Sequence, residues 1–143
     1  MHSVDIKVRG YHLDVYQHVN NARYLEFLEE ARWAFFEGFP LTETVHKQQL
    51  AFVLVNININ YRRPAFLNEV LQIHTKISNI GNKSCRVQQL ILEKDTQQVV
   101  ADAEVTFCVL DQVNHRAVSI EGDVRQVLQQ MLDQDEMPME VLG

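Results

Sequence analysis

A long apolar segment near the N-terminus restricts the possible folds more than any other part of the chain. Between residues 21 and 36, apolar side chains recur every three or four positions and cover far more than one narrow stripe of a helix. They are Tyr24, Leu25, Phe27, Leu28, Ala31, Trp33, Phe35 and Phe36. The thin polar side that remains carries Glu26, Glu29, Glu30 and Arg32. A helix lying on a surface has a wider polar face, so we expect this one to be wrapped by a sheet.

The periodicity changes from residue 52 onward to the value of two that is typical of β-strands. Apolar residues alternate with Asn56, Asn58 and Asn60 until Pro64 ends the strand. Further strands are expected at 4–9, 69–80, 83–94 and 98–110, and a short C-terminal helix at about 122–133. The pair Gly81-Asn82 suits a two-residue hairpin turn with positive φ between two of these strands. Antiparallel strands segregated from a helix indicate an α+β fold, with one highly curved sheet around the helix.

The length of 143 residues favours a single domain, 1–143, with 134–143 expected to form a flexible tail. No apolar run approaches the ~20 residues that span a bilayer, and no signal-peptide core is present at the N-terminus. A net charge of −6 without a basic run argues against nucleic-acid binding. Cys85 and Cys108 have no CxxC pairing, which favours buried free thiols and a reducing cytoplasm.

The six histidines show no metal-binding spacing, and GxSxG, P-loop and GxGxxG motifs are absent. The sequence therefore predicts no metal and no cofactor.

Asp14 is an isolated carboxylate a few residues before the start of the apolar helix. A helix N-terminus offers unpaired backbone N–H groups and a partial positive charge, and Asn20 or Asn21 suits its N-cap. A carboxylate can act as nucleophile or general base, and an N–H such as that of Asn21 can stabilise an oxyanion. Together they meet most needs of thioester hydrolysis. The alternative for Asp14 is a structural Asx turn.

The residues around Asp14 resemble a known family. Asp14, the run His18-Val19-Asn20-Asn21 and Tyr24 match the motif of the 4-hydroxybenzoyl-CoA-thioesterase-like acyl-CoA thioesterases, which have the hotdog fold. Further similarity lies in three segments: Glu30-Ala31-Arg32, residues 60–65 and Lys83-Ser84. Residues 8–12, which precede Asp14, are most similar to the corresponding segment of bacterial long-chain acyl-CoA thioesterases. Two departures are Gln17, where Gly is common, and the Tyr11-His12 pair.

This resemblance implies hydrolysis of fatty acyl-CoA to free fatty acid and CoA. Because the similarity is greatest to the long-chain group, the expected substrate is a long-chain acyl-CoA. It also implies a homodimer, or a homotetramer of two dimers, whose sheets join edge to edge. Each active site would lie between the Asp14 loop of one subunit and its partner. Two alternatives stay open: a thioesterase for acyl carrier protein or aromatic acyl-CoA, and an acyl-CoA-binding protein without turnover.

Several other residues are candidates for supporting roles. We expect His18 to shape the site rather than act as the base, and Asn20 to order the loop. Tyr24 either belongs to the core, which we favour, or lines an acyl channel. Basic side chains could hold the CoA phosphates, or could be ordinary solvated charges at strand ends; they are Arg62, Arg63, Lys83 and Arg86, with Ser84 beside them. The Asn56-Asn58-Asn60 face is expected to be sheet surface or a subunit contact.

Overall fold

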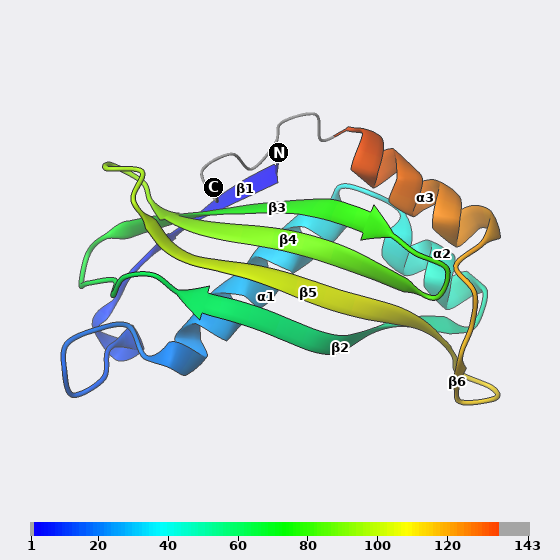
Figure 1. The fold of residues 1–143 in the computed structure, drawn as a ribbon, viewed down its shortest axis with the longest axis horizontal. Helices are drawn as coiled ribbons and strands as arrows, with labels where there is room; N and C mark the ends of the chain where they lie inside the picture. Colours follow the sequence, from blue (N-terminus) through cyan, green and yellow to red (C-terminus); the bar gives the residue numbers. More distant parts are fainter. Residues whose placement is uncertain (1, 135–143) are drawn as a thin grey trace.

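The computed structural model describes residues 2–134, in which a curved antiparallel sheet wraps around one long helix (Figure 1). The sheet order is β1-β3-β4-β5-β2, and a short β6 pairs with β5. The strands are β1 (His2–Lys7), β2 (Leu50–Tyr61), β3 (Val70–Ile80), β4 (Ser84–Glu93), β5 (Val99–Asp111) and β6 (Arg116–Ala117). The helices are η1 (Gly10–His12), α1 (Asn21–Glu37), α2 (Leu41–Lys47) and α3 (Gly122–Asp133). The α+β class and the curved sheet agree with the sequence-based prediction.

Helix α1 is the central helix of the fold, and its start is set by a side-chain cap. Asn20 is the N-cap, and its Oδ1 accepts a 2.9 Å hydrogen bond from the Ala22 N–H. One face of α1, including Phe27, Leu28 and Ala31, is buried in the core cluster with Leu71, Ile73 and Ile91 of β3 and β4. The predicted helix, residues 21–36, agrees with the observed α1 to within one residue at each end.

Two features of α1 differ from the expected pattern. Arg32 was placed on the polar side, but it is only 6% exposed and donates a 3.1 Å hydrogen bond to Gln89 Oε1. That prediction was wrong because residue periodicity does not show an acceptor on a distant strand. Conversely, Leu25 and Trp33 are 39% and 54% exposed, so a single copy leaves these two apolar side chains of α1 partly uncovered.

The hairpin between β3 and β4 forms as expected but by a different turn. Its loop comprises residues 81–83, and neither Gly81 nor Asn82 has positive φ. The positive-φ prediction is therefore wrong. Glycine is favoured here by close approach, since a Cβ at position 81 would lie 3.2 Å from the Ser84 carbonyl oxygen. The short elements η1, α2 and β6 were not predicted, because such brief segments carry too few periodic positions.

Strand β2 lies at the edge of the sheet, with β5 as its partner in residues 2–134 (Figure 1). The register with β5 shifts between Leu54 and Asn56, so Val55 forms a bulge. Val53, Leu54 and Val55 are 37%, 37% and 54% exposed, and the three asparagines that follow are also exposed. An apolar edge of this length is unusual in a monomer.

Both cysteines are free, as predicted, and burial raises the pKa of the Cys85 thiol to about 12. Cys108 is half-buried, so burial was overestimated for this residue. Among residues 2–134, no helix is long and apolar enough to cross a bilayer. The expected tail, 134–143, lies outside the described residues except for Gln134, whose N–H donates to the Gln130 carbonyl over 3.1 Å.

Candidate active site

The loop that carries Asp14 is closed by backbone hydrogen bonds. The Asp14 N–H donates to the His18 carbonyl over 2.9 Å, and Leu13 and Val19 form an isolated β-bridge. The Val19 N–H donates to the Ala65 carbonyl over 3.0 Å, which joins the loop to the segment after β2. This loop therefore sits at a defined place beside the start of α1.

The Asp14 carboxylate is fixed on one side and open on the other. Its Oδ1 accepts hydrogen bonds from the N–H groups of Tyr16, at 2.9 Å, and His18, at 3.4 Å. This is the Asx turn considered as the structural alternative. The same half-buried side chain also lines a pocket of about 260 Å³, and its Oδ2 accepts no hydrogen bond from residues 2–134. The turn therefore orients the carboxylate and leaves one oxygen for chemistry.

The start of α1 supplies an unpaired donor at the same pocket. Asn20 caps the Ala22 N–H, and the Arg23 N–H donates to the Asn20 carbonyl over 2.8 Å. The Asn21 N–H has no hydrogen-bond partner among residues 2–134, as expected for the first residue of a helix. Asn21 lines the pocket together with Asp14. The structure thus places the two residues expected to act on a thioester, Asp14 and Asn21, in the lining of one cavity.

His12, which departs from the family pattern, anchors this loop to the core. It is 8% exposed, and its ring meets Phe27 edge-on at 4.9 Å. Its Nδ1 accepts a 2.9 Å hydrogen bond from the Arg9 N–H, and its carbonyl accepts one from the Asn20 N–H. Burial, followed by the nearby Arg23 charge, lowers the His12 pKa. The lowered pKa favours the neutral ring, whose Nδ1 can accept the hydrogen bond from Arg9. The sequence did not indicate this structural role.

Two tyrosines form the wall of the pocket between α1 and β2. Tyr24 is a core residue at 2% exposed, and its hydroxyl accepts a 3.2 Å hydrogen bond from the Ala65 N–H. Burial raises the Tyr24 pKa, which keeps the phenol neutral. Tyr61 was not predicted as a site residue. Its ring lies 5.4 Å from that of Tyr24, and its hydroxyl donates to the Asn21 carbonyl over 3.3 Å.

His18 lines the same pocket and links it to the loop after β2. Its half-buried ring meets the Phe66 ring edge-on at 5.2 Å. Together with its N–H bond to Asp14, this arrangement suits the expected supporting role.

The basic candidates fall into two groups. Arg62 and Arg63 line the pocket; Arg62 pairs with Asp102 at 2.6 Å, and Arg63 binds both carboxylate oxygens of Glu69 at 3.0 and 3.1 Å. The Arg62 side chain is 54% exposed, whereas that of Arg63 is only 20% exposed. Arg62 is therefore the better placed of the two for a ligand.

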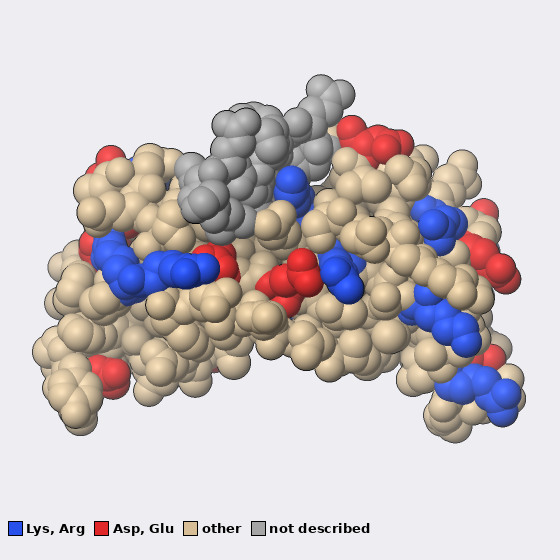
Figure 2. Space-filling view, in the orientation of Figure 1, with Lys and Arg blue, Asp and Glu red and all other residues tan. Residues whose placement is uncertain are grey.

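The hairpin candidates Lys83, Ser84 and Arg86 lie at the other end of the sheet. Along β5, Tyr61 pairs with Ala101 but Ser84 pairs with Cys108, seven residues further on. At about 3.3 Å per residue, this separation is roughly 23 Å. Figure 2 shows Lys and Arg in separate groups at the left, middle and right of the visible face rather than in one continuous basic surface. Within one copy, these hairpin residues do not reach the Asp14 pocket.

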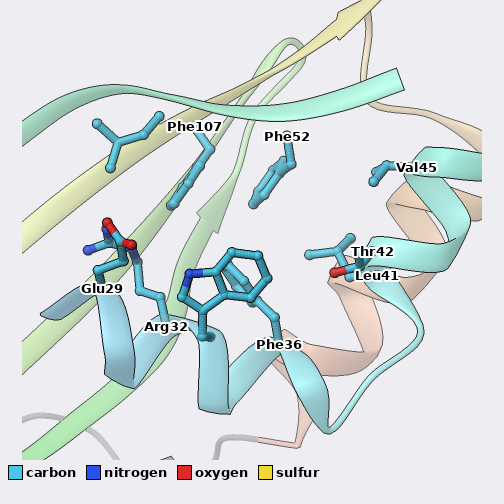
Figure 3. Close-up of a pocket in the computed structure, with 10 residues that line it drawn as sticks. Glu29, Arg32, Phe36, Leu41, Thr42, Val45, Phe52 and Phe107 are labelled. Carbon is cyan, nitrogen blue, oxygen red and sulfur yellow. The ribbon is translucent and has the colours of Figure 1, made fainter. Parts of the chain in front are cut away.

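A second, larger cavity lies where the C-terminal half of α1 faces α2 and the start of β2 (Figure 3). Its volume is about 370 Å³. It is lined by Glu29, Arg32, Trp33, Phe36, Leu41, Thr42, Val45, Phe52, Leu54 and Phe107. The Phe52 and Phe107 rings stack 4.5 Å apart. The sequence did not predict this pocket.

Among residues 2–134, no group of three or more His, Cys, Asp or Glu side chains could hold a metal ion.

Comparison with known proteins gives consistent matches. Residues 8–128 match the model of the thioesterase-like superfamily. The chain is 52% identical over 127 residues to the long-chain acyl-CoA thioesterase FadM of Escherichia coli, covering 89% of this chain and 96% of that protein. It is 27% identical over 109 residues to the acyl-CoA thioesterase YbgC of Haemophilus influenzae, covering 75% and 79% of the two chains.

A solved structure agrees with these relatives. The probable thioesterase YbaW of Escherichia coli matches with a TM-score of 0.87 and 50% identity, covering 92% of this chain and 99% of that one. These matches confirm the fold and the resemblance identified in the sequence.

Proposed function

The chain belongs to the thioesterase-like superfamily, and we propose that it hydrolyses long-chain acyl-CoA to a free fatty acid and CoA. The observation that supports this proposal is that Asp14 and Asn21 line one pocket, and that the Asn21 N–H has no hydrogen-bond partner among residues 2–134. The name of FadM, with which the chain shares 52% identity, supports the choice of long-chain acyl-CoA.

The proposed reaction begins with attack on the thioester carbonyl carbon. Either Asp14 attacks directly and forms an anhydride that water then opens, or Asp14 takes a proton from the attacking water. In both routes the carbonyl oxygen gains negative charge, which the Asn21 N–H and the positive end of α1 stabilise. The C–S bond then breaks and the thiolate leaves, since a thiol pKa of about 8.5 makes it a good leaving group.

We propose that two copies pair through their β2 edges, as a dimer or as a tetramer of two such dimers. The apolar, exposed residues 53–55 favour this edge, because a long unpaired strand readily accepts another. Antiparallel pairing about a two-fold axis near the middle of β2 would set the Tyr61 end of one copy beside the Phe52 end of its partner. Each Asp14 pocket would then open toward the second, larger cavity of the partner, called here the aromatic pocket because Phe36, Phe52 and Phe107 line it. That pocket would enclose the acyl chain.

Hydrolysis assays with acyl-CoA esters of graded chain length test this function directly. We expect saturable thiol release, with kcat/KM highest for long chains, and weak activity toward an aromatic acyl-CoA or an acyl carrier protein ester. Preference for either of those substrates would favour the corresponding alternative. Saturable binding of every acyl-CoA without thiol release would contradict the enzymatic proposal.

Arg62 is the proposed contact for the nucleotide phosphates, so we expect Arg62→Glu to raise KM about tenfold with little change in kcat. A charge-assisted contact to a remote part of the substrate contributes mainly to ground-state binding. The control is the matching acyl-pantetheine, which lacks the nucleotide and should be hydrolysed equally by both proteins. An equal loss with acyl-pantetheine would contradict the phosphate role.

A further inference from the structure

The aromatic pocket contains a feature that enclosing an apolar chain does not require: a buried guanidinium in its wall (Figure 3). Arg32 is 6% exposed, and its guanidinium carbon lies 5.8 Å from the centre of the Phe107 ring. Burying a charge costs free energy unless partners compensate for the lost water.

Most of the Arg32 donors are left uncommitted by the protein. One hydrogen bond, 3.1 Å to Gln89 Oε1, is present among residues 2–134, whereas a guanidinium has five N–H donors. No carboxylate of the described residues lies within 4.0 Å of it. Burial lowers the Arg32 pKa, and the exposed Glu29 raises it to a smaller extent. The protein thus pairs only part of the guanidinium, and its unpaired nitrogens are not among the fully buried side-chain atoms of residues 2–134.

The position of the guanidinium is fixed from behind by a buried hydrogen-bond network. Gln89 is completely buried, and its Nε2 donates to the Leu28 carbonyl at 3.0 Å and to Thr75 Oγ1 at 3.1 Å. These bonds determine which way the amide points, so its Oε1 must face Arg32. The network presents a pre-positioned cation to the pocket, which is the arrangement that favours recognition of a specific ligand group.

We propose that this pocket binds a fatty-acid anion, with the carboxylate on Arg32 and the hydrocarbon chain against Trp33, Phe36 and Phe52. Guanidinium and carboxylate match in geometry and charge, and the rest of the lining is mainly apolar. The volume of about 370 Å³ lies within the usual range of small-ligand sites, about 300–1,000 Å³. The anion is the product of the proposed hydrolysis, on which this proposal rests for the source of its ligand. Retained product would compete with the next acyl chain.

The single tryptophan of the chain, Trp33, lines this pocket and reports its occupancy. We would titrate the full chain with dodecanoate and, separately, with dodecanol, both below their micellar concentrations, and follow Trp33 fluorescence. Dodecanoate should bind at least about tenfold more tightly, the difference expected of one charge-assisted hydrogen bond. Arg32→Gln should remove this preference by weakening dodecanoate binding and leaving dodecanol binding unchanged.

Glu29→Gln is the matched variant that does not disturb the buried network. Glu29 is exposed at the pocket and repels an anion, so its neutralisation should tighten dodecanoate binding about two- to fivefold. Dodecanol binding should not change. The proposal is overturned if dodecanol binds the wild-type protein as tightly as dodecanoate, if dodecanoate gives no saturable change, or if Glu29→Gln leaves its affinity unaltered.

The fluorescence titration needs no turnover, so it separates this proposal from the proposed function. Selective dodecanoate binding without thiol release from any thioester would contradict the enzymatic function alone. Normal thiol release without selective dodecanoate binding would contradict only the Arg32 site.

Discussion

Replacing Asp14 with Asn should lower kcat for acyl-CoA hydrolysis by about 10²–10⁴-fold while the protein stays folded and still binds substrate. The amide can neither attack the thioester effectively nor remove a proton from water, and loss of a general base has an effect of about this size. The amide oxygen can still accept the hydrogen bonds from the Tyr16 and His18 N–H groups, so the loop should keep its shape. Thiol release and thermal unfolding measure the two effects separately.

Asp111 provides a closely matched control for this substitution. Its Oδ1 accepts hydrogen bonds from the N–H groups of Val113, at 2.8 Å, and Asn114, at 3.3 Å, so it forms the same kind of turn in another loop. Asp111→Asn should therefore leave hydrolysis unchanged. Wild-type kcat in a clean preparation of Asp14→Asn would remove Asp14 from the mechanism.

Periodicity predicted the main elements because the pattern of burial repeats along the sequence. The spacing of Val124, Val127 and Leu128 predicted helix α3 with its observed bounds, and all three side chains are buried. Strand β1 ends two residues before the predicted boundary, at Lys7. Helix α2 has only Leu41 and Val45 on its buried face, too few positions to establish a period.

In the candidate site, the parts that depend on residues close in sequence could be predicted, and the parts that depend on long-range contacts could not. Asp14 and Asn21 are close in sequence, so a loop-to-helix motif could predict that they share a pocket. Tyr61 joins them because the end of β2 meets the start of α1, and Arg32 has a buried partner because Gln89 faces it from β4. Contacts between residues 40 and 57 positions apart leave no periodic signal in a single sequence.

The proposed β2 interface leads to the second large effect: Val55→Lys should convert the oligomer to monomers and lower hydrolysis about 100-fold. Val55 is 54% exposed near the middle of β2, so the substitution disturbs little within one copy. Across a two-fold axis, however, two lysines would face each other with like charge. Separation of the copies would uncouple each Asp14 pocket from its partner, and mispositioning of substrate can cost about 10² in rate. Sedimentation velocity and thiol release at the same protein concentration measure both effects.

Val113→Lys is the matched control, since Val113 is 63% exposed in the turn between β5 and β6, past the Leu50–Asp111 pair at the start of β2 rather than near the middle of that strand. This variant should remain oligomeric and fully active, because its added charge faces solvent in either state. A wild-type protein that sediments as a monomer at full activity would rule out the interface. Monomeric Val55→Lys with normal hydrolysis would instead show that one copy holds the complete site, and the acyl chain would then have to bind within that copy.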